Sequence, residues 1–402
     1  MIRIAQLYKN AFDRLEPATW WLSLVMFVNR SGTMVVPFMT LYLTQSRHFT
    51  IGQAGVVLSI YGAGAVCGTF LGGKLVDKIG FHVVQLFALI GGGILFMILG
   101  QIASYPYICF FVFLLSIINE SFRPANYAAI AHYSREDNRT RSLSLNRLAI
   151  NMGWALGGAF GGFILAKNVH LLFWVDGITN ILAAVLLHFV LSPYHPQIFK
   201  LKKTDETADK NSSVYKDKSF LLLILFTLLF AFCFWQLFTT QPVFYREILH
   251  LSFPFIGFLM AMNGAIIGVF EMLVVFHLEN KRALLHYVSI GVALTGLSFF
   301  ILDILPRNQW LALISMITVT TGEMLTMSFL SAYWMGRTTP FNRGQYASLY
   351  TSGWSVAQVL GPGIGALIAQ HYGFTSLWGI TGTICIVSAL GYRGLLWKES
   401  AV

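Results

Sequence analysis

Long apolar runs follow one another through the whole sequence, separated by short segments that carry charge, proline or glycine. A helix needs about 20 apolar residues to cross a bilayer core about 30 Å thick. The runs are unbroken rather than alternately apolar and polar, which excludes barrel strands. The pattern predicts twelve transmembrane spans, at residues 18–44, 51–76, 83–103, 105–131, 142–166, 170–192, 219–244, 253–277, 284–304, 309–335, 344–370 and 374–397.

The composition supports this interpretation. Apolar residues make up 56% of the chain and charged residues 11%, against about 45–50% and about 25% in globular proteins. A soluble enzyme, a disordered protein and a secreted disulfide scaffold are thereby excluded. The four cysteines all lie inside apolar runs without metal-ligand spacing, so they are predicted to be small packing residues.

The positive charge predicts the orientation in the membrane. Of the 27 Lys and Arg residues, 20 fall in segments that are cytoplasmic if the N-terminus is inside, and four fall in the outer loops. Cytoplasmic loops of membrane proteins carry an excess of Lys and Arg. Both termini are therefore predicted to be cytoplasmic, and the net charge of +10 needs no nucleic-acid partner. The tryptophans at span ends are predicted to be interface anchors; they are Trp20, Trp21, Trp310 and Trp378.

The longest polar stretch divides the chain into two halves of six spans. It covers residues 193–218 and has the composition of a solvated linker, so residues 1–192 and 219–402 are predicted to form separate bundles. Gly153-Trp154 in span five recurs as Gly353-Trp354 in span eleven, at an offset of 200 residues. The predicted fold is an all-α membrane protein of two pseudo-symmetric six-helix bundles, as in two-bundle secondary transporters. Chance similarity between glycine-rich helices is the alternative for this repeat.

The loop between spans two and three carries a specific motif. Gly80 follows a predicted helix end and is free to adopt a positive φ, and Asp77 is placed to accept hydrogen bonds from helix N-termini or to pair with a cation. The motif resembles the cytoplasmic loop signature of the major facilitator superfamily, with Phe81 and His82 in place of its basic pair. That resemblance implies a gating loop formed by Gly73, Asp77, Lys78 and Gly80.

Spans four and five are similar to the drug/proton antiporter branch of the same superfamily. Arg123-Pro-Ala in span four is followed by basic residues and then by a glycine-rich fifth span, made up of Gly153, Gly157, Gly161 and Gly162. Glycines at this spacing also let two helix backbones approach closely, whatever is transported. Asn29-Arg30 in span one resembles the first span of proton-coupled peptide transporters, without the acids that precede the arginine there.

Ionisable residues inside the spans are the candidates for chemistry. A charge at mid-bilayer costs at least about 2.5–3.5 kcal/mol and normally faces a partner or a water-filled cavity. Glu120 and Arg123 are three residues apart, on one helix face. The predicted residues of the proton-coupling and substrate cavity are Arg30, Glu120, Arg123, Glu323, Asn29, Asn119, Asn126, Trp235, Gln236, Asp176 and Glu271.

Structural roles are open for each of these residues. Arg30, Glu120 and Arg123 would then form a permanent ion pair between spans one and four, and the amides would form interhelical hydrogen bonds. Asp176 would lie near the outer headgroups, and Glu271 would anchor a loop.

The function predicted from the sequence is alternating-access transport driven by protons. The chain has no phosphate-binding GxxxxGK[ST] motif and no HExxH or GxSxG motif, so neither ATP drive nor an enzyme is expected. The resemblance favours proton-coupled export of small amphipathic compounds. The alternative is proton-coupled uptake of a peptide, sugar or organic anion, which the two arginines would suit. We expect no cofactor or metal, and a monomer in a bacterial inner membrane whose partners are substrate, protons and lipid.

Overall fold

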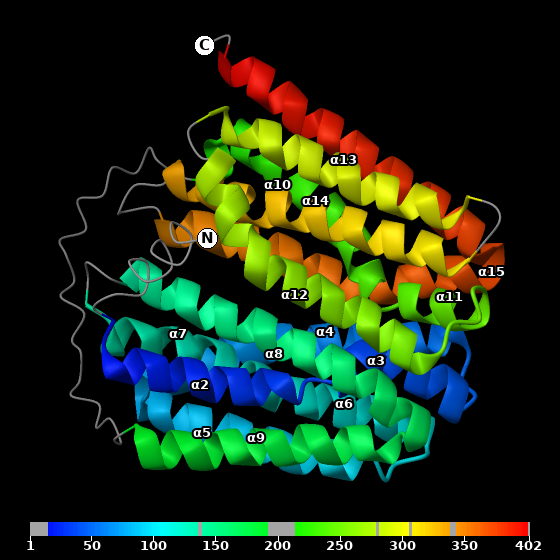
Figure 1. Cartoon of the computed structure of the whole chain (residues 1–402). Coiled ribbons are helices and arrows are strands. Elements are labelled where there is room, and N and C mark those ends of the chain that lie inside the picture. Colours follow the sequence, from blue (N-terminus) through cyan, green and yellow to red (C-terminus); the bar gives the residue numbers. More distant parts are fainter. Residues whose placement is uncertain are drawn as a thin grey trace, which may run out of the picture. The chain divides into compact units, whose positions relative to one another are not determined.

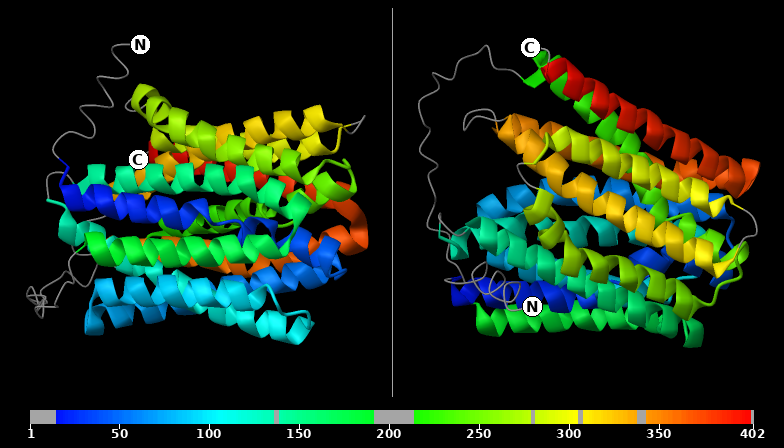
Figure 2. Two further views of the ribbon diagram at one scale, coloured as in Figure 1. Left: turned by 60° about the horizontal axis from the view of Figure 1, so that its bottom comes forward. Right: turned by 45° about the horizontal axis from the view of Figure 1, so that its top comes forward.

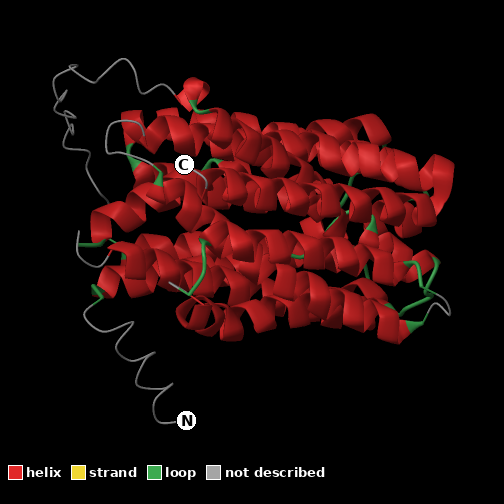
Figure 3. Cartoon of the chain, turned by 90° about the horizontal axis from the view of Figure 1, so that it is seen from above, coloured by secondary structure: helices red, strands yellow, loops and turns green. Residues whose placement is uncertain are grey.

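The computed structural model describes residues 15–135, 139–191, 214–278, 281–304, 308–337 and 343–400. Every regular element in these ranges is helical, with no strand among them (Figure 3). The predicted all-α fold class is confirmed. Of the predicted linker, residues 193–213 lie outside the described residues.

The helices match the predicted spans closely (Figure 1). Their bounds are α2 Pro17–Ser31, α3 Val35–Leu41, α4 Ile51–Ile79, α5 Phe81–Leu99, α6 Tyr105–Glu120, α7 Phe122–Tyr133, α8 Arg139–Lys167, α9 His170–Val190, α10 Lys218–Phe234, α11 Gln241–Glu247, α12 Phe253–Leu278, α13 Leu284–Leu302, α14 Gln309–Gly336 and α15 Arg343–Ser400. A π-helical turn, Tyr42–Ser46, extends α3, and short 3-10 turns cover Val214–Lys216 and Trp235–Leu237.

Eleven helical segments of the described chain are long and apolar enough to cross a membrane. The last of them, Gln345–Lys398, is twice the usual length. It consists of two helices that meet at Gly373, where φ is 81° and ψ is 168°. Glycine adopts this conformation without the steric cost that a side chain would bring. Residues 344–370 and 374–397 are therefore two spans, as predicted.

Prolines interrupt three of the spans. Proline lacks an N–H and its ring clashes with the carbonyl four residues earlier. For Pro124 that carbonyl belongs to Glu120, and the helix breaks at Ser121 between α6 and α7. Pro37 and Pro242 likewise follow the breaks between α2 and α3 and between α10 and α11. These breaks leave backbone groups that side chains must satisfy.

The described chain divides by its contacts into two compact units. Unit 1 holds residues 15–37, 60–191 and 260–265, and unit 2 holds residues 38–59, 214–259 and 266–400. Residues 260–265 of α12 belong to unit 1 because Gly264 packs against the backbone of Asn151 and Ala155 on α8. The predicted division at the linker stays a prediction.

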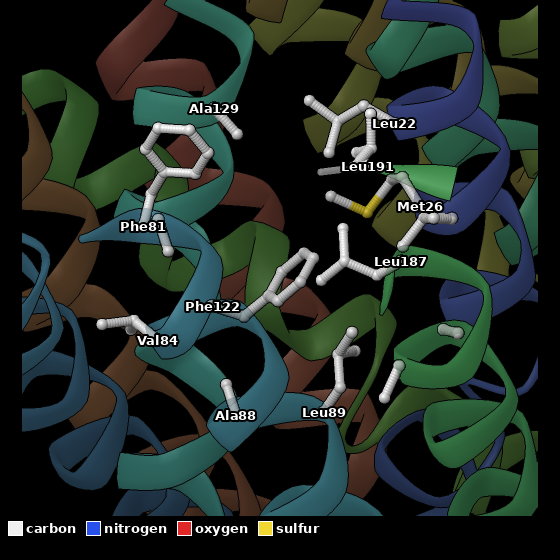
Figure 4. Packing of buried hydrophobic residues seen from close by; sticks show 14 of the residues in the cluster. Leu22, Met26, Phe81, Val84, Ala88, Leu89, Phe122, Ala129, Leu187 and Leu191 are labelled. Atoms are coloured by element: carbon white, nitrogen blue, oxygen red, sulfur yellow. The ribbon is translucent and has the colours of Figure 1, made fainter. Parts of the chain in front are cut away.

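The core of unit 1 lies where α2, α5, α7 and α9 pack together. Figure 4 shows Leu22 and Met26 of α2 facing Leu187 of α9, with Phe122 of α7 beside them. The helices α5 and α9 lie side by side, as the left view of Figure 2 shows. Since lipid tails are as apolar as leucine, such packing depends on close fit rather than on escape from water.

Unit 2 has an aromatic core in which one prediction proves wrong. Trp378 is fully buried rather than an interface anchor, and its ring stacks on Phe299 at 5.6 Å and an angle of 5°. Its neighbours Phe244 and Phe374 lie at 5.4 and 6.0 Å. Trp378 is near a span end in the sequence, but its helix face turns toward α13. Trp20, Trp21 and Trp310 are exposed, as interface anchors would be.

Candidate functional site

Glu120 is buried inside unit 1 at the break of the fourth span. It is the last residue of α6, and 6% of its surface is exposed. Its Oε2 pairs with Arg123 Nη2 at 2.9 Å across the break. The spacing of three residues therefore brings the two charges together, as the sequence predicts. Half of the Arg123 side chain, 51%, remains exposed.

A second helix brings Tyr61 to the same carboxylate. The Tyr61 hydroxyl lies 3.3 Å from Glu120 Oε1, and the Tyr61 side chain also hydrogen-bonds with Asn119. The helices α4 and α6 approach closely because glycines line α4 at four-residue spacing. A Cβ built on Gly68 would lie 2.4 Å from the carbonyl oxygen of Ile117.

Sequence reasoning did not single out Tyr61. The signal that identifies it is the glycine stripe that begins three residues later, at Gly64, Gly68 and Gly72. Such a stripe indicates the face of span two that meets another helix. Tyr61 lies at the end of that face. The hydroxyl of Ser116 on α6 donates a hydrogen bond to the backbone carbonyl of Tyr61 at 2.6 Å.

Arg30 completes the cluster from span one. Its guanidinium lies within electrostatic range of Glu120 and Arg123, and of the hydroxyls of Tyr61 and Tyr127. Its Nε is buried and has no hydrogen-bond partner among the described residues. Helix α2 reaches this position because Gly153 of α8 leaves room for it: a Cβ there would lie 2.5 Å from the Arg30 Cβ.

The cluster has an excess of positive charge. Two guanidinium groups face one carboxylate, so an ionised Glu120 leaves one charge uncompensated and a protonated Glu120 leaves two. Buried polar groups are nearly always hydrogen-bonded, and the buried Nε of Arg30 is a donor without a partner among the described residues. This arrangement is suited to a ligand that carries a negative charge or a dipole.

Two of the predicted amides form interhelical bonds in unit 1. Asn29 Nδ2 donates to Asn180 Oδ1 at 2.9 Å, and Asn126 Nδ2 lies 3.4 Å from Asn146 Oδ1. These contacts join α2 to α9 and α7 to α8. The sequence alone left open whether such amides pack or bind, and both form packing contacts here.

Asp176 is buried inside unit 1. It is 1% exposed on α9, and its two oxygens accept the backbone N–H groups of Met34 and Val35 at 2.9 and 3.0 Å. Its carboxylate contacts the break in span one, four residues beyond Arg30. Whether Asp176 also lies near the outer headgroups stays a prediction.

The remaining predicted residues belong to unit 2. Glu271 Oε1 accepts a hydrogen bond from Ser328 at 2.6 Å, which links α12 to α14. Glu323 is half-buried on α14, and Trp235 is half-buried at the end of α10. Gln236 is fully buried, and its Nε2 donates to the Gly361 carbonyl at 2.9 Å.

The loop motif of unit 1 has the predicted backbone. Gly80 has φ 84° and ψ 155°, a conformation that favours glycine. Asp77 and Lys78 are exposed. Within the described part of the chain no hydrogen bond or ion pair is recorded for Asp77, so its predicted gating contact stays a prediction.

An ion pair that sequence analysis missed recurs in both units. Each joins the acid just before the first span of a half to the arginine after its fourth span. In unit 1, Glu16 pairs with Arg135 at 2.6 Å, and in unit 2, Asp217 pairs with Arg337 at 3.1 Å. The two acids, and likewise the two arginines, are separated by about 200 residues, which is the offset of the sequence repeat. This offset is the signal in the sequence that could have identified the recurring ion pair.

Asp217 has the richer set of partners. Its oxygens accept from the Phe220 N–H at 3.0 Å and from the Tyr346 hydroxyl at 3.0 Å, besides Arg337. Burial opposes ionisation of Asp217, but these three donors outweigh it and lower the pKa of the carboxyl below its usual value. Asp217 also caps the N-terminus of α10.

Among the described residues, no group of three or more His, Cys, Asp or Glu side chains is placed to hold a metal ion. The fold and the buried cluster define the class first: a multi-span helical membrane protein with ionisable side chains inside its spans. The sequence profile of the Major Facilitator Superfamily matches residues 21–348, and the chain belongs to that superfamily.

Known proteins of this kind resemble the chain over most of its length. It is 23% identical to the Na(+), Li(+), K(+)/H(+) antiporter of Planococcus maritimus, over 92% of this chain and 93% of that protein. It is 22% identical to the class E tetracycline resistance protein of Escherichia coli, over 77% of this chain and 76% of that protein.

A solved structure of a POT family transporter in complex with 5-aminolevulinic acid superposes with a TM-score of 0.79 at 15% identity, over 94% of this chain and 96% of that one. At this identity the likeness shows the fold alone.

Proposed function

We propose that the protein is a proton-coupled secondary transporter that exports small amphipathic compounds, with Glu120 as the proton carrier. The observation that carries this proposal is the buried carboxylate of Glu120 between Arg123 and Tyr61, beside the unpartnered guanidinium nitrogen of Arg30. The names of the relatives, an antiporter and a tetracycline resistance protein, support export.

The coupling follows from charge. When Glu120 is ionised it pairs with Arg123, and when it is protonated that pair is lost and the cluster becomes more positive. A cationic or dipolar compound that interacts with the ionised carboxylate competes with the proton, which is the requirement for exchange. Opposite charges stabilise each other strongly where water is scarce.

Uptake is the second candidate, and one observation favours it. The excess of guanidinium groups over carboxylates suits an anion, and protonation of Glu120 strengthens that attraction. A proton and an anionic substrate would then bind together rather than compete, and they would move in the same direction. Both functions use the same carrier and differ in the sign of the coupling.

Proteoliposomes that contain a pH-sensitive dye test the proposal. Ethidium, tetracycline, NaCl and 5-aminolevulinic acid are added in turn under an imposed pH gradient. Export predicts that entry of a compound is accompanied by proton movement in the opposite direction, and uptake predicts movement in the same direction.

The variant Glu120→Gln should lower gradient-driven flux at least about a hundredfold, the contribution usual for a positioned proton-transfer group. Its matched control is Glu247→Gln, an acid bonded to Gln45 in unit 2 at 3.1 Å. Full gradient-driven flux in Glu120→Gln would contradict the assignment.

A further inference from the structure

Span one is interrupted just beyond Arg30, where residues 32–34 leave the helix between α2 and α3. A new helix begins at Val35, so the N–H groups at its start have no partner within the helix. Inside a membrane no lipid can satisfy them, and each unsatisfied group costs several kcal/mol. Another side chain must therefore accept them.

Asp176 of α9 is that side chain. Oδ1 accepts the N–H of Met34 at 2.9 Å and Oδ2 accepts the N–H of Val35 at 3.0 Å, so each oxygen serves one donor. The residue as a whole is 1% exposed. Hydrogen bonds to an ionised acceptor are about twice as strong as neutral ones, so this pair fastens the break firmly to α9.

The neighbouring residues of α9 hold the same segment. Asn180, one turn after Asp176, accepts from Asn29 at 2.9 Å. A Cβ built on Gly32 would lie 1.7 Å from the Thr179 hydroxyl oxygen, so only glycine allows this approach. The break is thus a tightly fitted joint whose only ionisable member, among these described residues, is Asp176.

No described charge compensates Asp176. Besides Asp176, the titratable groups with described side chains on α9 and on the helices packed against it, α2, α5 and α8, are Arg30, His82, Arg141, Arg147, Lys167, His170 and His188. The described groups that interact with the carboxylate of Asp176 are the two backbone donors. Arg30 interacts instead with Glu120, Arg123 and tyrosines, and His170 bonds to the Gly100 carbonyl at 2.8 Å.

We propose that Asp176 is a proton-binding site that fastens the break in span one when ionised and releases it when protonated. A proton from water that binds one oxygen turns that oxygen into a hydroxyl, which is a poorer acceptor and requires an acceptor of its own. The N–H of Met34 or Val35 then loses its partner. No other bond changes in this step.

The break in span one lies close to the point where the chain passes from unit 1 to unit 2. Residues up to Pro37 belong to unit 1, and residues from Phe38 belong to unit 2. Span one therefore passes from one unit to the other close beyond the break, and a looser joint frees the two parts of the span to change their angle. This inference goes beyond the proposed function, which places the transported proton on Glu120.

Amide hydrogen exchange at Met34 and Val35, measured on the full-length protein in nanodiscs without substrate, tests the proposal. After correction for intrinsic exchange, we expect protection to fall about tenfold or more between about pH 8 and about pH 5. In Asp176→Asn, protection should be reduced at both pH values and independent of pH. The control Asp303→Asn, an acid bonded to Thr375 in unit 2, should keep the wild-type pH dependence.

Two outcomes would overturn the proposal. One is equal protection of the wild-type amides at both pH values, which needs no variant to fold. The other is the same pH dependence in Asp176→Asn as in the wild type. Glu120→Gln should retain the pH dependence of these amides, because the described partners of the Glu120 carboxylate are Arg123 and Tyr61 and not residues of the break. Loss of transport in Glu120→Gln therefore reports on the proposed function, and amide protection reports on Asp176.

Discussion

The two halves of the chain interrupt their first span in different ways. Pro37 follows the break in span one, and Pro242 follows the break in span seven. In span one the free backbone donors are bound by the carboxylate of Asp176, which comes from another helix. In span seven the amide of Gln236, within the span itself, organises the break.

The Gln236 side chain uses both of its ends. Its Oε1 accepts from the hydroxyls of Thr239 and Thr240 at 3.3 and 3.0 Å, and its Nε2 donates to the carbonyls of Phe232 and Gly361 at 3.1 and 2.9 Å. An amide carries no charge at any physiological pH. The two equivalent breaks are each followed by a proline, but a titratable group binds the free backbone donors only in span one. Only the break in span one is therefore expected to respond to protons.

Gln236→Glu places a titratable group at the break in span seven. Of the variants described below, it is expected to have the largest effect on stability. At about pH 8 the new carboxylate would face the carbonyls of Phe232 and Gly361, lone pair against lone pair, and the buried charge would have no cation. We expect a loss of about 3–5 kcal/mol in the free energy of unfolding. SDS titration of the purified protein in mixed micelles measures it.

The variant should recover stability as the pH falls, since a protonated carboxyl can donate to one carbonyl. Its control is Gln241→Glu, in which the glutamine that contacts Tyr245 is replaced. Equal stability of Gln236→Glu and wild type at about pH 8 would show that the amide bonds do not organise the break.

Substitutions at the repeated glycines, Gly153 and Gly353, are expected to have an intermediate effect on stability. A Cβ at Gly153 would lie 2.5 Å from the Arg30 Cβ and 2.9 Å from the Arg30 carbonyl carbon, whereas at Gly353 the nearest atom is Ile224 Cγ2 at 3.4 Å. Gly153→Ala should therefore destabilise by about 1–3 kcal/mol, as overpacking does. Gly353→Ala should be neutral or stabilising, because alanine favours a helix.

Thermal unfolding followed by tryptophan fluorescence compares these two variants directly. Each replaces one glycine in the middle of an equivalent span, so any general effect of the added methyl group is shared. Equal loss of stability in both variants would mean that the approach of α8 to α2 is no closer than its counterpart in unit 2.

The paired acids before spans one and seven give the smallest expected effect. The pKa of Asp217 is lowered, so its contacts stabilise the folded state above the ordinary aspartate pKa of about 3.9 and are lost as the pH falls through the folded-state value. Asp217→Asn should cost about 1–2 kcal/mol at about pH 6, with the difference from wild type shrinking toward about pH 3.

Glu16→Gln is the matched control for Asp217→Asn. The Glu16–Arg135 pair is more exposed, at 34% and 70% of the side chains, than the Asp217–Arg337 pair, at 21% and 26%. Exposed ion pairs contribute about 0–1 kcal/mol to stability, so Glu16→Gln should lower the free energy of unfolding by less than Asp217→Asn does. A loss in Glu16→Gln as large as in Asp217→Asn would show that exposure does not distinguish the two pairs.

Much of the candidate site could be predicted where its members share a helix. Glu120 and Arg123 are three residues apart, and helix geometry alone places them together. Tyr61 and Arg30 come from other helices, and their approach depends on glycines that let backbones pack closely. Trp378 shows the same limit, since its place at a span end did not reveal that its face turns inward onto Phe299.

The sequence by itself determined the all-helical membrane fold, because the length of each apolar run and the position of helix-breaking residues are local properties. The thickness of the bilayer and its lack of hydrogen-bonding groups act on these properties directly. The sequence also showed which charged residues lie within the spans. Because a charge inside the bilayer costs free energy, these residues are candidates for a functional role. Only the tertiary structure decided that Asp176 binds the backbone of span one and that Arg30 keeps an unpartnered nitrogen near Glu120. Contacts between residues about ninety or more positions apart in the sequence depend on which helix faces meet, and close packing rather than local pattern fixes that choice.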